Sequence, residues 1–269
     1  MYWCICHEVN IRLWNLTSRS RLQRVLKKIG VTNFLENIQD LPPESSLFIV
    51  RGDYLFDDRI LLWLSKEKNS GLEIRSGSRQ ILVAAHVDSS HASPTWQSIQ
   101  NGECSGIPNL QTKNLENLSL SFSNELRKSD HPFVLPIRED NKEVLEGQLF
   151  TGSYKGVTDL VTKFLWPIPA KWATRLCALR GISPNQVTTA SLVLVVIVGI
   201  LFAYGYFLEG LVLGWVMTFL DTVDGKLARV TVTSTKWGNL FDHGIDLIHP
   251  PLWYLAWGIG LSSFIPVLS

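Results

Sequence analysis

Apolar residues recur at regular spacing through the first part of the chain. From Ser18 to Ile29 they fall three or four residues apart, with Arg and Lys between them and Gly30 behind, which predicts an amphipathic helix that ends at the glycine. Asp57–Lys66 has the same helical spacing. Leu47–Val50 and Ile81–Val87 are instead short continuous apolar runs, which are typical of buried strands. Strands that alternate with helices predict an α/β layer domain.

The pattern changes from about His91 to Gly147. Periodicity is lost there, and Ser, Asn, Gln and Glu dominate apart from short apolar pieces such as Phe133–Ile137. Two interpretations fit this composition: loops and an edge hairpin that belong to the α/β domain, or a partly ordered connection to the segment that follows.

A second amphipathic stretch begins near Val157. Apolar bulk mixes there with positive charge, as in a helix that lies at the level of lipid head groups. The residues concerned are Leu160, Val161, Phe164, Leu165, Trp166, Trp172, Leu176 and Leu179, with Lys163, Lys171, Arg175 and Arg180. Pro167 and Pro169 should divide the stretch into two pieces. The alternative is an ordinary helix packed on the soluble domain, and we favour the membrane interface because an apolar span follows closely.

That span has a well-marked beginning. Gly181 can end the preceding helix, Ser183 is a good N-cap, and Pro184 suits the first helical turn, where its missing N–H would have no partner. No charged residue occurs from Val187 to Phe207, so this segment can cross a bilayer.

Two further apolar runs predict two more membrane helices. They are Leu208–Ala228 and Trp237–Phe264, and Pro250 and Pro251 should kink the latter. The expected domains, in chain order, are a soluble α/β domain (1–150), an interfacial helix and linker (151–186) and an all-α transmembrane domain with three spans (187–269).

Basic residues predict the orientation, because they are retained on the cytoplasmic side of a membrane. They precede the first span and flank the turn between the second and third, at Lys226, Arg229 and Lys236, whereas the turn between the first and second carries only Glu209. Met1 is not followed by the basic start and apolar core of a signal peptide. We therefore expect a multi-pass integral membrane protein, of the kind found in a bacterial inner membrane, with a cytoplasmic N-terminal domain.

Composition adds little to this picture. The chain has 269 residues, of which 46% are hydrophobic, and a net charge of +1. Its scattered cysteines lack zinc-site spacing and are expected to be free thiols: Cys4, Cys6, Cys104 and Cys177. Six tryptophans fit interface belts and lipid-facing bulk better than base-stacking platforms, so no nucleic-acid partner is expected: Trp166, Trp172, Trp215, Trp237, Trp253 and Trp257.

Four aspartates lie in or beside the most apolar third of the chain, where carboxylates are unfavourable unless they serve a function. The stretch DTVDGKLARVTVTSTKWGNLFDHGID starts at Asp221 and fits the spacing DxxDGxxAR, eight residues, then GxxxDxxxD. Its fixed positions are Asp221, Asp224, Gly225, Ala228, Arg229, Gly238, Asp242 and Asp246.

The four aspartates form two pairs. Asp221 and Asp224 are three residues apart and Asp242 and Asp246 four apart, so each pair shares one face of its helix. Two helices that run antiparallel across a short turn would gather the four carboxylates, and a divalent cation would relieve their repulsion. Mg²⁺ or Mn²⁺ is therefore implied.

The remaining fixed positions suit a phosphate-bearing ligand. Gly225 and Gly238 leave room for close approach, Ala228 keeps the helix face narrow, and Arg229 offers a planar fork of donors to phosphate oxygens. Together with a metal they indicate a pyrophosphate pocket.

The motif resembles the signature of the CDP-alcohol phosphatidyltransferase family, integral membrane enzymes that join an alcohol to a phosphatidyl or phospho-alcohol group and release CMP. The upstream ISPNQVT, Ile182–Thr188, resembles the start of that family's first membrane helix. The resemblance implies two Mg²⁺ or Mn²⁺ ions, a CDP-linked lipid or alcohol as donor, an alcohol acceptor, a lipid bilayer and a homodimer. The implied roles are metal ligands at Asp221, Asp224, Asp242 and Asp246, general base at Asp246, and CDP contacts at Gly225, Ala228, Arg229 and Gly238.

Other interpretations of the acidic cluster stand beside this one. The carboxylates could form ion pairs with Lys226, Arg229 or Lys236, or belong to an ion pathway in a transporter. A transporter needs neither the glycines nor the arginine at these offsets, which favours the enzyme. His243 and His249 lie beside the motif and could contact a substrate, although packing is the favoured interpretation of both.

Family members generally have six membrane helices, whereas this chain ends after the third expected one. The resemblance therefore implies a fragment, a chain that depends on a partner, or an inactive protein with an intact motif. The corresponding alternative function is a non-catalytic membrane subunit with a structural metal site.

A second resemblance concerns SLFIVRGDYLFDDRIL, Ser46–Leu61. It has the pattern of a strand that ends at Gly52 and Asp53 and is followed by a helix, similar to the metal-binding segment of sugar-phosphate nucleotidyltransferases. Such an enzyme needs a glycine-rich, basic loop over its triphosphate, and no such loop precedes Arg12. We therefore expect a degenerate or regulatory nucleotidyltransferase-like domain, with Asp53 as its candidate catalytic residue.

Overall fold

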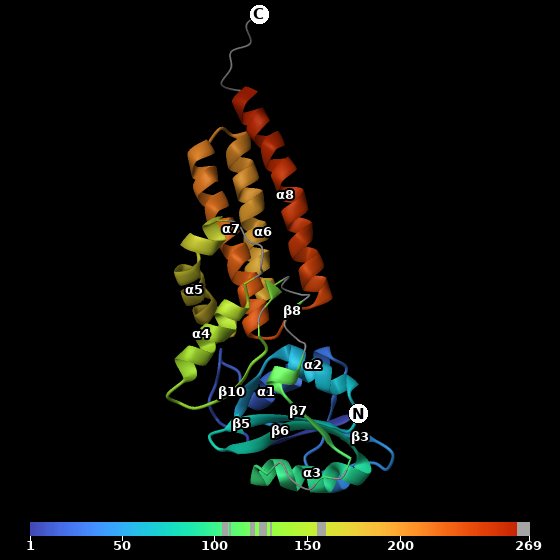
Figure 1. Ribbon diagram of the computed structural model, residues 1–269. Coiled ribbons are helices and arrows are strands. Elements are labelled where there is room, and N and C mark those ends of the chain that lie inside the picture. Colours follow the sequence, from blue (N-terminus) through green and yellow to red (C-terminus); the bar gives the residue numbers. More distant parts are fainter. Residues whose placement is uncertain are drawn as a thin grey trace, which may run out of the picture. The chain divides into compact units, whose positions relative to one another are not determined.

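The computed structural model describes residues 1–103, 107, 109–118, 122–123, 128–129, 131–154 and 160–262, without the side chains of Phe122, Ser123, Lys128, Ser129, Lys236, Asn239 and Asp242. It divides into two compact units, Met1–Val157 and Thr158–Ser269, and each is described by itself. The first unit holds a β-sheet with helices, and the second consists of helices (Figure 1). The expected order, an α/β region followed by an all-α region, is confirmed.

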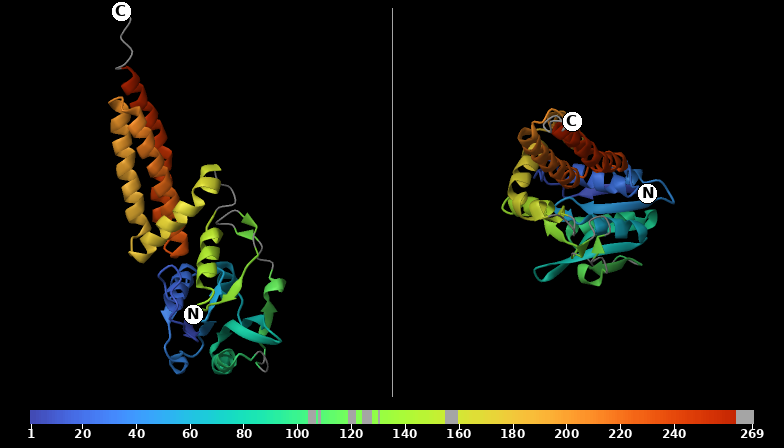
Figure 2. Two further views of the ribbon diagram at one scale, coloured as in Figure 1. Left: turned by 90° about the vertical axis from the view of Figure 1, so that its left-hand side faces the viewer. Right: turned by 90° about the horizontal axis from the view of Figure 1, so that it is seen from above.

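A six-stranded mixed sheet forms the centre of the α/β unit (Figure 2). From one edge to the other its strands are β2 (Asn33–Phe34), β1 (Tyr2–Cys6), β3 (Ser46–Arg51), β6 (Arg79–Asp88), β5 (Ser70–Ser76) and β7 (Gln111–Asn114). β1 is parallel to both of its neighbours, β6 is antiparallel to β3 and β5, and β7 is parallel to β5. Two small antiparallel sheets pair β4 (Tyr54–Phe56) with β10 (Val134–Pro136) and β8 (Phe122–Ser123) with β9 (Lys128–Ser129).

Helices lie on both sides of this sheet, with α3 on one side and α1 and α2 on the other (Figure 1). Their bounds are α1 (Ser18–Lys28), α2 (Asp58–Lys66), α3 (Ser89–Asn101) and α4 (Lys142–Gly152), with short 3₁₀-helices η1 (Ile38–Asp40) and η2 (Leu115–Asn117). Because β3 is covered on both faces, Leu47–Val50 is fully buried, as the continuous apolar run predicts. The predicted helices at α1 and α2 are confirmed, and the side chains of Thr17 and Asp57 cap them.

The polar region from His91 to Gly147 contains structure that its composition did not predict. Most of α3 lies in it, and its inner face is made by small or hydroxyl-bearing residues together with Ile99, so no apolar stripe was visible. The same region holds β7, β10 and the start of α4. It therefore contributes elements to the α/β unit, including one edge of the main sheet.

Helix α4 is held to the unit by a buried carboxylate. Glu146 is 5% exposed, and its Oε1 accepts a hydrogen bond of 2.9 Å from the backbone N–H of Trp14. The Trp14 indole N–H in turn donates to Glu146 O at 3.1 Å, and its ring stacks on Phe150. Trp14 and Asn15 both have positive φ, and this tight turn points a backbone N–H at the helix.

The helical unit begins with a π-helical turn, Val161–Leu165, followed by α5 (Pro167–Leu179). The predicted division at Pro167 is confirmed, since proline occupies the first turn of α5. Three long helices follow: α6 (Pro184–Ala203), α7 (Phe207–Val230) and α8 (Lys236–Ser262). α6 packs against both α7 and α8, and α8 continues through Pro250 and Pro251.

Within the described residues, α6 alone combines the length and apolar composition of a membrane span, over 20 residues with a mean hydropathy of 2.3. α7 and α8 are longer, at 24 and 27 residues, but charged positions interrupt their apolar runs. For these two helices, membrane crossing stays a prediction.

Candidate functional site

The first wall of the candidate site is the start of α6. Gly181 has φ of +69° and ends α5, as predicted. Ser183 and Gln186 form a capping box: Ser183 Oγ accepts from Gln186 N at 3.3 Å, and Gln186 Oε1 accepts from Ser183 N at 2.8 Å. The cap fixes the first turn of α6, which carries Pro184 and leads to Thr188.

The second wall is the C-terminal half of α7, which carries the first five motif positions. Asp224 is 4% exposed and lies against α6, where its Oδ2 accepts a hydrogen bond of 2.6 Å from Thr188 Oγ1. Asp221, one turn earlier, is partly exposed. The two carboxylates therefore belong to one end of one helix, as their spacing predicts, but they differ in burial.

A tight turn brings the start of α8 back to α7. The backbone N–H groups of Val232 and Thr233 donate to Arg229 O and Ala228 O, at 3.2 and 2.8 Å, which is the pattern of a Schellman motif. Val232 occupies the left-handed position of this motif with φ of +54°, a conformation that is strained for a β-branched residue. Thr235 Oγ1 then accepts from Gly238 N at 3.0 Å and caps α8.

A cavity of about 40 Å³ lies where these three segments meet. It is lined by Pro184, Asn185 and Thr188 of α6, by Asp224, Gly225 and Ala228 of α7, and by Thr233, Ser234, Thr235 and Gly238 of the turn and α8. This volume holds a water molecule or an ion, not a nucleotide. Four of the eight motif positions are thus brought together: Asp224, Gly225, Ala228 and Gly238.

The two motif glycines leave room for polar groups. A Cβ at Gly225 would lie 3.0 Å from Arg229 Nη2, so the missing side chain makes space for the guanidinium. A Cβ at Gly238 would lie 3.1 Å from Thr235 Oγ1 and 3.5 Å from Asn185 Oδ1. Both positions are therefore close approaches between groups of the chain itself, and the predicted approach of a nucleotide to these glycines stays a prediction.

The remaining motif residues lie outside the cavity lining. Asp221 and Arg229 are on α7 and partly exposed, and Asp246 is exposed on α8. Asp242 is also on α8, with a side chain outside the described atoms.

This segment matches known proteins. Residues 181–267 match the family model described as CDP-alcohol phosphatidyltransferase. Residues 181–267 belong to that family. Cholinephosphotransferase 1 of Danio rerio is 37% identical over 79 residues, which are 25% of this chain and 20% of that protein. Archaetidylinositol phosphate synthase of Pyrococcus horikoshii is 29% identical over 101 residues, which are 36% of this chain and 50% of that protein. The chain therefore spans half or less of each of these relatives.

The donor chemistry of the CDP-alcohol phosphatidyltransferase motif fits Mg²⁺ or Mn²⁺, which prefer carboxylate oxygens. Asp224 in particular is a buried carboxylate that faces a cavity large enough for an ion. Among the side chains that are described, which leave out Asp242, no three His, Cys, Asp or Glu come together as a metal site. The metal ligands predicted from the motif therefore stay a prediction.

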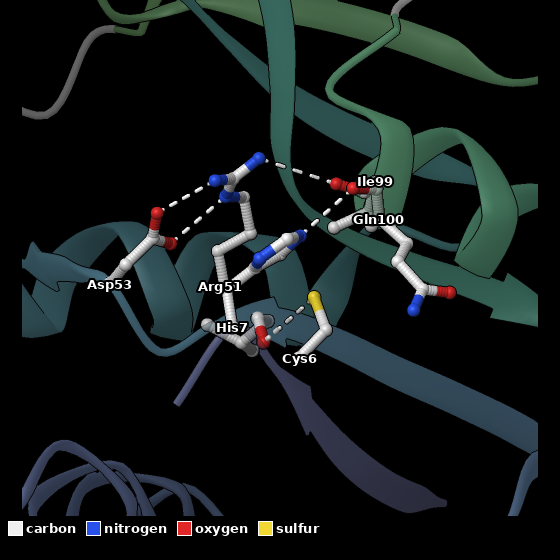
Figure 3. A network of polar contacts seen from close by, with 7 residues as sticks. Cys6, His7, Arg51, Asp53, Ile99 and Gln100 are labelled. Atoms are coloured by element: carbon white, nitrogen blue, oxygen red, sulfur yellow. Dashed lines mark hydrogen bonds and ion pairs between the residues drawn. The ribbon is translucent and has the colours of Figure 1, made fainter. Parts of the chain in front are cut away.

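The candidate catalytic Asp53 of the α/β unit lies in a different setting (Figure 3). Arg51 Nε and Nη2 donate to its two carboxylate oxygens at 2.9 and 2.6 Å, and Arg51 Nη1 donates to Ile99 O at 3.3 Å. His7 Nε2 lies 2.9 Å from Gln100 O. Arg51 and His7 thus meet the last carbonyls of α3, where the helix dipole favours the positive charge of Arg51.

The bond to Asp53 raises the pKa of Arg51 above its ordinary value. Both side chains are less than about a third exposed, at 12% and 25%. The bond from Arg51 to Ile99 O joins the end of β3 to the end of α3, and the bidentate bond to Asp53 holds the guanidinium in that orientation, which gives Asp53 a structural role in this unit.

Sequence reasoning missed several residues of the CDP-alcohol phosphatidyltransferase segment. Thr188 and Asn185 belong to the family-like start of α6 and have no further signal in the sequence, and Thr233–Thr235 lie between the fixed positions of the motif. The available signal for Thr188 is a hydroxyl in the polar first two turns of an otherwise apolar helix. Lys226 was considered as an ion-pair partner, and it is buried at 3% exposure.

Proposed function

We propose that the helical unit transfers a phosphatidyl or phospho-alcohol group from a CDP-linked donor to an alcohol acceptor, with release of CMP, in phospholipid biosynthesis. The observation that carries this proposal is the cavity at which α6, α7 and α8 meet, because half of the motif positions line it. The matched relatives are named for different head groups, so the proposal names the acceptor only as an alcohol.

The donor side of the reaction is assigned to the small residues and the arginine. Gly225, Ala228 and Gly238 line the cavity, and none of the three places a long side chain there. Arg229 lies beside Gly225, and a guanidinium binds two phosphate oxygens at once. In this proposal Arg229 holds the diphosphate of the donor while the nucleoside lies outside the small cavity.

The acidic residues are assigned to charge and proton transfer. Asp221, Asp224, Asp242 and Asp246 would hold two Mg²⁺ or Mn²⁺ ions, which neutralise the diphosphate and the departing CMP when bound. Asp246 is exposed, so an acceptor from the aqueous side can reach it and its proton can return to water.

The chemical step is a displacement at phosphorus. The acceptor hydroxyl oxygen forms a bond to the phosphorus that carries the donor's alcohol, and the bond from that phosphorus to the oxygen of CMP breaks. The hydroxyl proton passes to Asp246. The products are a phosphodiester, CMP and one proton, so the step needs no oxidant or further reactant.

A lipid setting is part of the proposal. α6 exposes Val193, Val196, Ile197 and Ile200, and α5 exposes Ile168 and Trp172, a distribution that suits contact with lipid. We place the acidic end of the bundle and the N-terminal unit on the cytoplasmic side, as the basic residues predict. A second copy of the chain completes the proposed assembly.

The deciding experiment compares Asp242→Asn with Glu209→Gln in the full chain, purified and reconstituted into liposomes. Glu209 is an exposed acid in the first turn of α7, far along that helix from Asp224, and serves as the matched control. CMP release is followed with CDP-linked lipid or CDP-linked alcohol donors against a panel of alcohols. Asp242→Asn should reduce CMP release to background without loss of membrane insertion, and Glu209→Gln should behave as the unchanged chain.

Equal turnover of Asp242→Asn and the unchanged chain would refute the assignment. No CMP release with any alcohol, together with a rise in melting temperature on addition of Mn²⁺, would instead indicate a non-catalytic subunit with a structural metal site. Flux of ions across sealed vesicles that is independent of CDP would indicate a transporter.

A further inference from the structure

Thr188 bonds differently from the other threonines near it. Three of these donate to the carbonyl oxygen four residues back in their own helix: Thr189, Thr222 and Thr231. Thr188 Oγ1 lies 3.0 Å from Pro184 O in its own helix, but only 2.6 Å from Asp224 Oδ2 in α7.

The carboxylate is the better acceptor for this hydroxyl. A hydroxyl has one proton to donate, and 2.6 Å is the length of a charge-assisted O–H···O⁻ bond. Both side chains are buried, at 7% exposure for Thr188 and 4% for Asp224, so water does not replace the bond easily. Thr188 therefore donates across the helix interface to a motif residue 36 positions away in the chain.

The bond also lies beside the cavity. Thr188 and Asp224 both line it, on the walls formed by α6 and α7. A hydroxyl held by the capped first turns of α6 fixes one carboxylate oxygen, and this restricts the rotation of the carboxylate. A neutral donor orients the group without cancelling its charge.

We propose that Thr188 is a positioning residue, whose hydroxyl sets the orientation in which Asp224 receives a divalent cation. The inference rests on the proposed function, since an ion at Asp224 is part of it. Carboxylates that ligate a metal are themselves hydrogen-bonded, and loss of such a partner typically lowers metal affinity about 10- to 100-fold.

The test is a titration with Mn²⁺ alone, in which free Mn²⁺ is measured by electron paramagnetic resonance. The full chain is used in detergent micelles, unchanged and as Thr188→Val, Thr188→Ser and Thr189→Val. Valine has the shape of threonine without the hydroxyl, serine keeps the hydroxyl, and Thr189 is an exposed neighbour whose hydroxyl stays in its own helix.

Thr188→Val should weaken Mn²⁺ binding about 10- to 100-fold, whereas Thr188→Ser and Thr189→Val should bind close to the unchanged chain. The Mn²⁺ concentration that gives half-maximal CMP release should shift in parallel. A residue that only packs α6 on α7 would change the melting temperature and leave both midpoints in place. If Thr188→Val does not fold, Thr188→Cys takes its place: a thiol is a weaker donor than a hydroxyl, so this variant should bind Mn²⁺ more weakly than Thr188→Ser.

Coincident midpoints for Thr188→Val and Thr189→Val would overturn the inference, as would an unchanged chain that binds no Mn²⁺. The proposed function fails separately. A chain that binds Mn²⁺ but releases no CMP would refute the transferase, while the order of the midpoints would still decide the role of Thr188.

Discussion

The chain contains two aspartates that adjoin a glycine, and they have different partners. In the α/β unit, Asp53 receives two hydrogen bonds from Arg51, which carries an opposite charge. In the helical unit, Asp224 receives a hydrogen bond from the neutral hydroxyl of Thr188 beside a cavity. The bidentate arginine compensates the charge of Asp53 and contacts a second element, whereas the hydroxyl of Thr188 orients the carboxylate of Asp224 without adding a charge of its own. An aspartate with a neighbouring glycine in the sequence can therefore be either a structural residue or a candidate metal ligand, and the two residues alone do not distinguish these roles.

The difference between the two aspartates is tested most strongly by removing the charge of each one in turn. Asp224→Asn should lower CMP release by about 100-fold or more, in the range seen when a group that acts in the reaction is lost. Asp53→Asn should leave CMP release of the folded protein unchanged and lower the free energy of unfolding of the α/β unit by about 1–3 kcal/mol, because Arg51 loses a charged acceptor. Enzyme assays in liposomes and chemical denaturation measure the two effects. An inactive but folded Asp53→Asn variant would contradict the structural role of that residue.

The adjoining glycines should differ as well. A Cβ at Gly52 would lie 2.7 Å from Ile5 Cδ1 and 3.1 Å from the backbone Cα of Glu8, so Gly52→Ala should destabilise the α/β unit by about 1–3 kcal/mol. A Cβ at Gly225 would meet the flexible end of Arg229, at 3.0 Å from Nη2. Gly225→Ala should therefore change stability little and raise the KM for the CDP-linked donor. Thermal unfolding and initial rates test the pair, and a stability loss of equal size at both glycines would argue against the distinction.

The two units should also differ in how they respond to pH, because the α/β unit contains a buried histidine. This is the smallest of the expected effects. His86 is 1% exposed, and burial lowers its pKa below its ordinary value, although Nδ1 lies 3.1 Å from both Leu64 O and Glu67 O. The unfolded chain therefore binds the proton first as the pH falls. Stability of the α/β unit should decrease from pH 7 toward pH 5, by at most about 1.4 kcal/mol per pH unit from this group.

His86→Leu should flatten that dependence, which chemical denaturation at pH 7, 6 and 5 would measure. The pH dependence of CMP release should be the same with and without His86. A parallel change in both profiles would show that the α/β unit takes part in the reaction.

Local patterns predicted much of the fold. The apolar spacing of α1 and α2, the continuous apolar run of β3, and the Gly181, Ser183 and Pro184 signals before α6 all correspond to elements in the structure. Helix α3 was not predicted, because its inner face uses Ala92, Thr95 and Ser98 beside Ile99. Small residues suffice to fill the interface there because α3 lies close against the sheet. The distance between helix and sheet depends on tertiary packing and cannot be predicted from the sequence of the helix.

The candidate site was predicted in part. The motif spacing indicated that Asp224, Gly225, Ala228 and Gly238 belong together, and they line one cavity. The spacing did not indicate that the start of α6 would form a wall of the cavity, nor that Asp246 would be exposed where Asp224 is buried. Both depend on how α6 packs against α7 and α8.

The sequence by itself determined several elements, among them α1, α2, β3 and the start of α6, together with the family match of residues 181–267 and the order of the acidic positions. These are carried by side chains within one or two turns of each other, whose spacing and caps act locally. Only the tertiary structure decided the partners: Thr188 for Asp224, and the end of α3 for Arg51. Hydrogen bonds between elements form when packing brings distant segments within about 3 Å, and no local preference specifies that distance.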